Sequence, residues 1–168
     1  MVRLATEADL ERINELRQQV NRLHVEGRPD IFRPGFCDEL RDRARTLLSS
    51  PGHDILVCER EGAICGMACV DYVVKPESPY GREQRFYHVE ELGVDAAWRR
   101  QGVARELTDF MRADARRRGL DRIVLDVWEF NDEALVFYDA MGFKTFRRML
   151  ELRPDEGIPL RPTAHNDI

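Results

Sequence analysis

The sequence lacks the features of several large classes of protein. No apolar run approaches the ~18 residues of a membrane span. The first residues, MVRLATEADLERI, carry acidic side chains where a secretory signal needs an apolar stretch. The four cysteines are Cys37, Cys58, Cys65 and Cys69, and no two of them form a C-x-x-C pair. Three of them lie in apolar runs, which favours buried, reduced thiols over a disulfide or a metal site. These absences predict a cytoplasmic chain without a metal ion.

Positive charge is also too scarce for non-specific binding to nucleic acid. The 168 residues include 26 Lys and Arg against 31 Asp and Glu, a formal net charge of −5. Binding to nucleic acid through its phosphates needs an excess of basic side chains on one face. An anionic ligand must therefore meet a local basic site, and neither a nucleic-acid partner nor a membrane partner is expected.

The pattern of apolar residues predicts a single domain of alternating elements. Helices are predicted over residues 7–24, 38–48, 103–119 and 132–141, and strands over residues 2–5, 54–60, 63–74, 85–94, 122–127 and 143–152. Thr6 is predicted to cap the first helix with Asp9 three residues later, and Glu61 and Gly62 are predicted to form a tight hairpin. This order predicts an α+β three-layer sandwich with a mixed, mostly antiparallel sheet flanked by helices on both faces. We expect this domain to cover residues 1–153 and a polar tail to cover residues 154–168.

One short stretch carries the strongest chemical signal. Residues 97–111 read AWRRQGVARELTDFM, a turn with small residues at Gly102 and Ala104 that leads directly into a helix. Such a turn lets successive backbone N–H groups converge on an anion at the positive end of the helix dipole. Three arginines add local positive charge: Arg99, Arg100 and Arg105. The stretch therefore predicts a cradle for a pyrophosphate group.

Two other phosphate-binding motifs do not fit. A dinucleotide-binding fingerprint fails because Leu107 stands where its third glycine is required, although Gly102 opens a helix and Asp126 ends a strand. No G-x-x-x-x-G-K-[ST] sequence is present.

Residues 89–144 resemble the GNAT N-acetyltransferase superfamily. The sequence Arg99-Arg100-Gln101-Gly102-Val103-Ala104 matches the pattern [QR]-x-x-G-x-[GA] between a strand and a helix, and VWEFNDEALVFYDAMGFK reproduces a second motif at the usual separation. The resemblance implies acetyl-CoA as the co-substrate, with its pyrophosphate at residues 99–104. Its pantetheine arm is then expected to pair with Leu92, Gly93 and Val94, where the strands 85–94 and 122–127 separate. Arg100 and Gln101 depart from the Gly and Lys that are frequent in the superfamily, but neither removes a backbone donor.

The resemblance also implies a proton donor for the leaving thiolate. This donor is a tyrosine on the helix of the second motif, here Tyr138. Tyr138 could instead be a core aromatic, because it shares helical spacing with Ala134 and Met141. Asn131, which precedes this helix, could cap it, hydrogen-bond the pantetheine arm, or do both.

An amine acceptor must lose a proton before it attacks, so a base is also needed. Regular alternation places His88, Glu90 and Leu92 on one face of the strand 85–94, and Val89, Glu91 and Gly93 on the other. Superfamily members often use a carboxylate on this strand, so Glu90 ranks first, His88 second and Glu91 third, with Glu129 a weaker candidate. Alternatively, Glu90 and Glu91 attract substrate or are simply solvated.

The predicted function is direct transfer of an acetyl group from acetyl-CoA to an amine of a small, cationic acceptor or of a protein. The preference for a cation rests on an acidic set around the expected cleft: Asp71, Glu90, Glu91, Asp126 and Glu129. Alternation could instead turn several of these side chains to solvent. An alternative function is a CoA-binding sensor or interaction module of the same fold without catalysis. The edge of the last predicted strand also leaves room for a homodimer.

Overall fold

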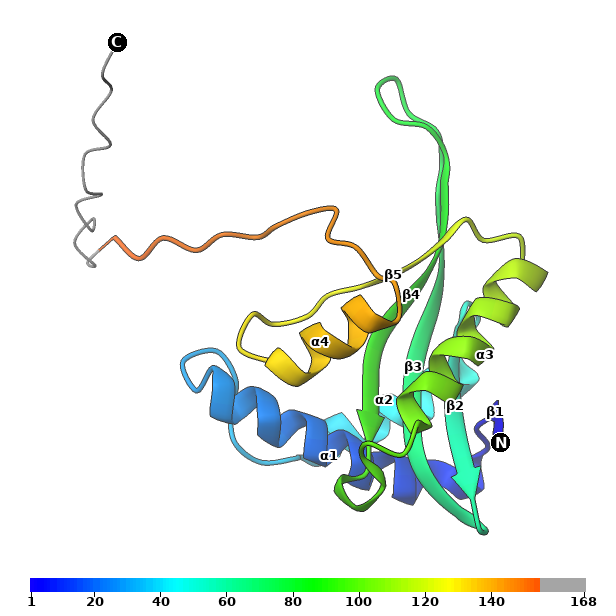
Figure 1. Ribbon diagram of the computed structural model, residues 1–168, viewed down its shortest axis with the longest axis vertical. Coiled ribbons are helices and arrows are strands. Elements are labelled where there is room, and N and C mark those ends of the chain that lie inside the picture. The colour runs from blue at the N-terminus through cyan, green and yellow to red at the C-terminus, as the bar shows by residue number, and fades with distance from the viewer. Residues whose placement is uncertain (155–168) are drawn as a thin grey trace.

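A five-stranded sheet is the framework of the structure, a computed structural model that describes residues 1–154 (Figure 1). Its strands are β1 (Val2–Leu4), β2 (His53–Arg60), β3 (Ala63–Lys75), β4 (Gln84–Val94) and β5 (Arg122–Leu125). They lie in the order β1-β2-β3-β4-β5, and every pair is antiparallel except β4 with β5. The mixed, mostly antiparallel α+β sheet is therefore confirmed. The predicted tail lies outside the described residues, apart from Pro154.

Helices cover both faces of this sheet. They are α1 (Leu10–Gly27), α2 (Asp38–Ser49), α3 (Val103–Arg117) and α4 (Asp132–Ala140). Successive residues of β2 point to opposite faces. Ile55 packs in a core with Ile13 and Leu16 of α1, whereas Leu56 packs in a second core with Leu107 of α3. The α1 and α2 helices thus lie on one face and α3 lies on the other.

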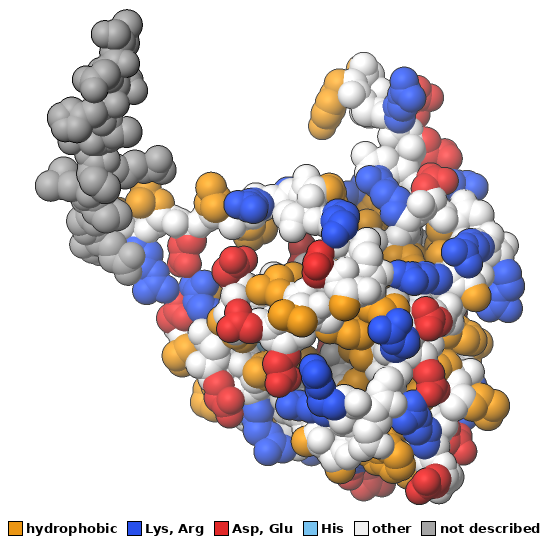
Figure 2. All heavy atoms as spheres, in the orientation of Figure 1, with side chains coloured by type: hydrophobic (Ala, Val, Ile, Leu, Met, Phe, Trp, Pro, Cys, Tyr) orange, Lys and Arg blue, Asp and Glu red, His pale blue; other side chains and the backbone are white. Residues whose placement is uncertain are grey.

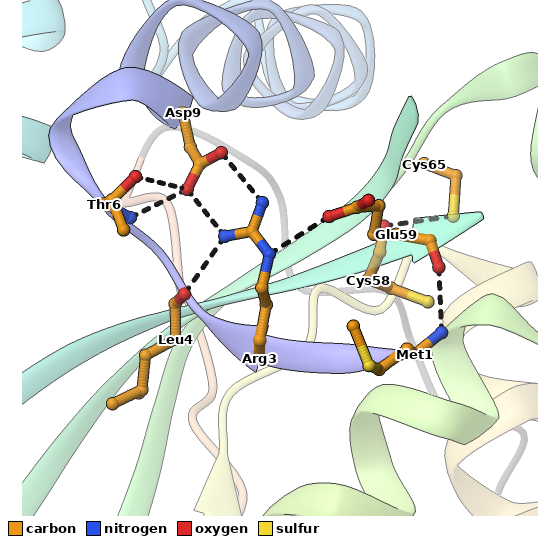
Figure 3. Close-up of polar contacts among 8 residues, drawn as sticks. All are labelled: Met1, Arg3, Leu4, Thr6, Asp9, Cys58, Glu59 and Cys65. Atoms are coloured by element: carbon orange, nitrogen blue, oxygen red, sulfur yellow. Dashed lines mark hydrogen bonds and ion pairs between the residues drawn. The ribbon is translucent and has the colours of Figure 1, made fainter. Parts of the chain in front are cut away.

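The start of the first helix follows the predicted cap (Figure 3). The Thr6 amide and hydroxyl both donate to the Asp9 carboxylate, at 2.7 and 3.0 Å, and the first turn (Glu7–Asp9) is a 3-10 helix. Arg3 on β1 binds the same carboxylate with both terminal nitrogens, at 2.8 and 3.0 Å. Hydrogen bonding from Arg3 is the main cause that lowers the pKa of Asp9 to about 2. This partly buried network ties the sheet edge to the helix.

The predicted hairpin between β2 and β3 is also confirmed. Glu61 and Gly62 both have left-handed backbones, with φ of 52° and 76°. A two-residue turn of this kind suits the twist of paired antiparallel strands. It places Arg60, the last residue of β2, close to the turn before α3.

A bulge at Glu90 changes which side chains of β4 share a face. Val89 is opposite Val70 and Glu91 is opposite Cys69, so Glu90 is an extra residue between the two pairs. Val89 faces the core beneath α3, and Glu91 binds Arg17 of α1 on the other face. The prediction that His88 and Glu90 share a face with Leu92, opposite Glu91, is therefore wrong. Regular alternation allows no extra residue, and pairing with β3 introduces one here.

The pairing of β4 with β5 stops halfway along β4. It runs from Phe86 opposite Arg122 to Val89 opposite Leu125, where β5 ends. β4 continues to Val94 and remains paired with β3 on its other edge. The predicted separation of these two strands is confirmed, and it begins at the bulge.

The strand predicted over residues 143–152 is wrong. Figure 1 shows this segment leaving α4 and running away from the sheet, without regular secondary structure. Alternating apolar side chains favour an extended backbone, but a strand also requires a neighbouring strand with which to pair. Residues 143–152 have no such neighbour in the described part of the chain.

Candidate functional site

The cradle, residues 99–105, connects the end of β4 to α3. A short 3-10 helix (Ala96–Trp98) leads into it. Arg100 and Gly102 both have left-handed backbones, with φ of 62° and 85°. Glycine adopts this conformation freely, whereas arginine is strained by it. A glycine at position 100, frequent in the superfamily that the sequence resembles, would relieve this strain.

Gly102 leaves open space at the start of α3. An ideal Cβ atom on Gly102 would have the Nη2 atom of Arg60, 3.9 Å away, as its nearest neighbour. In the described part of the chain, the amide groups of residues 102–104 donate to no main-chain acceptor. Free amides at a helix N-terminus are ready donors for an anion. The geometry therefore fits the pyrophosphate group of acetyl-CoA.

The side chains of the cradle add positive charge that no carboxylate offsets. The basic residues concerned are Arg99, Arg100 and Arg105, all of them exposed. Within residues 1–154, none of these three forms an ion pair. An acidic chain thus has a local basic surface where the helix dipole is also positive.

Arg60 supports the cradle from the hairpin, and sequence reasoning missed it. Its Nη1 atom donates to the Gln101 carbonyl oxygen at 2.9 Å, and its Nη2 atom binds the Glu106 carboxylate on α3. The Gln101 side chain folds back and donates to the Ala97 carbonyl oxygen at 3.0 Å. Gln101 therefore stabilises the turn through its side chain as well as through its carbonyl oxygen. No local signal marks Arg60, because 41 residues separate it from Gln101 in the sequence.

The first helix braces the residues just before the cradle. Arg12 and Gln19 of α1 donate to the Asp95 carboxylate at 2.5 and 3.2 Å. Gln19 also accepts a hydrogen bond from the Ala96 amide at 3.1 Å. The path of the chain from β4 to α3 is thereby fixed on the α1 side as well as on the hairpin side.

The last residues of β4 present a free backbone edge beside the cradle. Leu92 and Val94 pack against the core beneath α3, and Gly93 is buried under α1. A Cβ atom on Gly93 would lie only 2.8 Å from Val20 Cγ2, so only glycine lets α1 approach this closely. Because the β5 ladder has already ended, the edge of residues 92–94 that faces β5 is open to an extended ligand.

Arginines from α1 and α2 engage the two glutamates of β4. Arg17 donates to Glu91 at 2.9 Å, and burial raises the pKa of Glu91 in spite of this partner. Glu90 forms an ion pair with Arg43. Both carboxylates therefore already have an arginine partner, which the ranking of base candidates from the sequence did not take into account. The two partners lie 74 and 47 residues away in the sequence, which is why no local signal revealed them.

His88 belongs to a line of polar groups across the sheet. Its Nδ1 atom lies 3.2 Å from one oxygen of Asp71, whose other oxygen lies 2.6 Å from His53 Nδ1. On its other side, His88 Nε2 lies 3.9 Å from the exposed carboxylate of Asp126, just beyond β5. The imidazole thus lies between Asp71 on β3, which it contacts at hydrogen-bond distance, and Asp126 at the end of β5.

Tyr138 lies on α4, in a largely apolar setting. Its ring contacts Phe137 and Phe143, with centroids 5.3 and 5.4 Å away. Burial raises the pKa of Tyr138 to about 12, and its hydroxyl has no hydrogen-bond partner among residues 1–154. Asn131 caps α4, because its side-chain oxygen accepts from the Ala134 amide at 3.2 Å.

Aromatic side chains fix the loop between β5 and α4 against the end of α1. Phe32 stacks on His24 at 5.0 Å and meets Trp128 edge to face at 5.4 Å. Phe130, in the same loop as Trp128, packs closely against Gly27 at the end of α1. Only glycine leaves this room, since a Cβ atom there would lie 2.2 Å from the Phe130 ring. This cluster holds the loop that carries Asp126 and Glu129.

All four cysteines lie within the described residues. Cys58, Cys65 and Cys69 are buried free thiols, as predicted, and Cys37 is exposed and free. Residues 1–154 contain no group of three or more His, Cys, Asp or Glu side chains arranged to hold a metal ion. No helix among these residues has the length and apolar composition needed to cross a membrane.

Sequence relatives were found for most of the domain. Residues 13–143 match the acetyltransferase (GNAT) family. Human N-acetyltransferase 8 is 32% identical over 109 residues, which cover 65% of this chain and 46% of that protein. The uncharacterized N-acetyltransferase YjgM of Escherichia coli (strain K12) is 28% identical over 108 residues, which cover 64% of this chain and 61% of that protein. The chain thus spans about half the length of the curated relatives it matches.

Solved structures share this fold over most of the chain. The crystal structure of a point mutant of the BH1408 protein from Bacillus halodurans has a TM-score of 0.88 and 28% identity, covering 91% of this chain and 98% of that one. The aminoglycoside N-acetyltransferase AAC(6')-Iy in complex with CoA has a TM-score of 0.71 and 18% identity, covering 92% and 94%. At that identity the second likeness concerns the fold alone.

Proposed function

Since the chain belongs to the acetyltransferase (GNAT) family, we propose that it transfers an acetyl group from acetyl-CoA directly to an amine of a small acceptor or of a protein. One observation carries this proposal. The free amides of residues 102–104 lie at the helix start, next to the open β4 edge of residues 92–94. A pyrophosphate with an extended arm needs this combination, because anion donors and a free strand edge must lie within reach of one ligand.

The cradle and β4 divide the binding of the co-substrate between them. The backbone of residues 99–104 holds the pyrophosphate, with exposed arginines nearby, and the backbone of residues 92–94 pairs with the pantetheine arm. Acetyl-CoA supplies the activated acetyl thioester. Arg60 and the α1 contacts to Asp95 keep the cradle in the required shape.

The contacts favour His88 over Glu90 as the base. Arg43 and Arg17 already engage the two glutamates of β4, whereas Asp71 orients the His88 ring. With its Nδ1 proton directed to Asp71, His88 has a lone pair on Nε2 that can accept the amine proton. Histidine is also the side chain that most often serves this purpose.

Tyr138 is the proposed acid for the leaving thiolate. A tyrosine hydroxyl is protonated at neutral pH at its ordinary pKa of about 10, and burial raises the pKa of Tyr138 further, to about 12. This hydroxyl has no partner within residues 1–154, so its proton is available for transfer. A protonated amine loses two protons as the N–C bond forms and the C–S bond breaks. His88 removes the proton that must leave before attack, and the second proton, lost after attack, replaces the one that Tyr138 gives to sulfur.

The acceptor is proposed to be a cationic amine. Arg43 and Arg17 offset part of the predicted acidic set. Asp126 is exposed near His88, with Arg147 3.9 Å away, and Glu129 is exposed on the loop that follows β5. An exposed carboxylate beside the base, here Asp126, attracts a positively charged acceptor. A polyamine, an aminoglycoside or a lysine side chain has this chemistry.

A panel of amines with acetyl-CoA tests the proposal, with release of free thiol as the signal. We expect thiol release that depends on an added amine and is fastest with cationic amines. A chain that acetyl-CoA protects against heat, but that releases no CoA with any amine, would be a binding module instead. Glutamate as the best acceptor would overturn the proposed acceptor class alone.

A further inference from the structure

Three polar residues lie side by side across the middle strands of the sheet. His53, the first residue of β2, is opposite Asp71 on β3, and Asp71 is in turn opposite His88 on β4. The amide of Tyr72, the next residue after Asp71, donates to the Gly52 carbonyl oxygen at 2.9 Å and fixes the start of β2. The register of three strands therefore places two imidazoles on one carboxylate.

Both rings contact the Asp71 carboxylate through the same nitrogen. His53 Nδ1 lies 2.6 Å from one oxygen, and His88 Nδ1 lies 3.2 Å from the other. An ionised carboxylate only accepts hydrogen bonds, so each Nδ1 must carry a proton to bind it. A neutral ring of this kind has its lone pair on Nε2. Asp71 thus selects the tautomer of His88 that can act as a base.

Among the described residues, the Asp71 side chain has only these two hydrogen-bond partners. On the face drawn in Figure 2, acidic and basic side chains are interspersed over the surface. Arginines also pair with both glutamates of β4. Within residues 1–154, by contrast, no Lys or Arg side chain pairs with Asp71. The direction of its carboxylate therefore depends on the two imidazoles.

The carboxylate on the other side of His88 is a weaker competitor for the ring. Asp126 lies 3.9 Å from His88 Nε2, beyond hydrogen-bond distance, and its side chain is 82% exposed. The 3.2 Å contact of His88 with Asp71 is at the long end of the hydrogen-bond range, whereas His53 holds the same carboxylate at 2.6 Å. The shorter bond thus fixes the acceptor on which the longer bond depends.

We propose that His53 is a positioning residue for His88, because it fixes the Asp71 carboxylate that holds the His88 ring in its Nδ1–H tautomer. The role rests on the proposed function, in which His88 is the base. In the reaction the amine proton moves to His88 Nε2, while the Nδ1 proton stays between His88 and Asp71. The carboxylate then faces the positive charge that develops on the ring. His53 acts only through Asp71 and neither gains nor loses a proton in the transfer.

Nitrogen-15 NMR of a histidine-labelled chain tests the positioning without any substrate, since a ring nitrogen with a proton and one with a lone pair differ in chemical shift. At about pH 9 imidazole rings are neutral, and the His88 signals are assigned by their loss in His88→Gln. We expect the Nδ1–H tautomer for His88 in the native chain. His53→Phe keeps a ring but loses the donor, so His88 should become a mixture of tautomers. His53→Asn, whose amide nitrogen can stand where Nδ1 stands, should keep the native tautomer.

Tyr72→Phe is the matched control. It removes a 2.6 Å hydrogen bond between Tyr72 and Asp54, which lie one position along the same two strands. Because successive residues of a strand alternate, this bond is on the opposite face of the sheet, under α3. The control should therefore leave the His88 tautomer unchanged. Circular dichroism should show that all three variants are folded.

Steady-state kinetics with the best amine of the panel gives a second readout. His53→Phe should lower kcat by about 10 to 100-fold, because a misplaced ring no longer meets the amine proton. The KM for acetyl-CoA should change little, and His53→Asn and Tyr72→Phe should keep a kcat close to the native value.

Three results would each overturn the proposal. They are an Nε2–H tautomer of His88 in the native chain, an unchanged tautomer in His53→Phe, and an equal loss of kcat in His53→Phe and His53→Asn. The expected tautomers without turnover of any amine would instead support the positioning and refute the proposed function.

Discussion

Arg60, at the end of β2, donates a hydrogen bond of 2.9 Å to the carbonyl oxygen of Gln101 in the cradle. The same guanidinium binds Glu106 in the first turn of α3. One side chain from a distant hairpin thus links the two ends of the segment whose amides are proposed to bind the pyrophosphate. The cradle is therefore held by tertiary contacts as well as by its local sequence.

Replacing Arg60 tests this support. Arg60→Ala should raise the Kd for acetyl-CoA by about tenfold, because the Gln101 carbonyl oxygen and the Glu106 carboxylate both lose a charged donor and the turn is then held less firmly. The rate at saturating acetyl-CoA should change little. Arg45→Ala is the control, since Arg45 is an exposed arginine of α2 paired with Asp42 on the same helix. Equal affinities of Arg60→Ala and the native chain would show that the cradle does not need this contact.

Two substitutions test whether His88 or Glu90 is the base. His88→Gln should lower kcat by about 100-fold or more, the usual range for a lost general base, with little change in acetyl-CoA affinity. Glu90→Gln, which breaks only the contact with Arg43, should have a much smaller effect on kcat. Steady-state kinetics with the best amine of the panel measures both. The reverse order of effects would return the role to Glu90.

The proposed acid is tested by removing one hydroxyl. Tyr138→Phe keeps the ring contacts with Phe137 and Phe143, so the fold and acetyl-CoA binding should persist. We expect kcat to fall by about 10 to 1,000-fold. Tyr80→Phe, at an exposed position in the loop between β3 and β4, is the control and should be silent. Normal turnover in Tyr138→Phe would leave Tyr138 with a packing role only.

The Asp9 network predicts a defined loss of stability in acid. In the folded chain the pKa of Asp9 is about 2, below the ordinary value of 3.8. The ionised Asp9 therefore stabilises the fold above pH 3.8, and this contribution disappears as the pH falls toward 2. At 1.36 kcal/mol per pKa unit the shift corresponds to about 2 kcal/mol. Asp9→Asn should therefore reduce the free energy of unfolding at pH 7 and flatten its dependence on pH between about 5 and 2, measured by urea unfolding. An unchanged acid slope would contradict this assignment.

Local signals predicted much of the fold. The Thr6 cap, the Glu61-Gly62 hairpin and the turn at Gly102 depend on residues close together in the sequence, and all three are confirmed. The bulge at Glu90 depends on pairing with β3, which side-chain alternation cannot reveal. The partners of the β4 glutamates come from α2 and α1, 47 and 74 residues away. Residues 143–152 read as a strand in sequence, but a strand also needs a neighbour, and the described part of the chain offers them none.

Calorimetric titration of acetyl-CoA into the native chain and Gly102→Glu tests the central claim most directly. The variant adds a side chain and a negative charge where the cradle amides converge, so we predict that measurable binding is lost while the fold persists. Gly119→Glu is the matched control. It places the same side chain on another left-handed glycine, with φ of 65°, at the opposite end of α3, and it should bind acetyl-CoA normally. Unchanged affinity in folded Gly102→Glu would contradict the account, because the cofactor would then bind elsewhere.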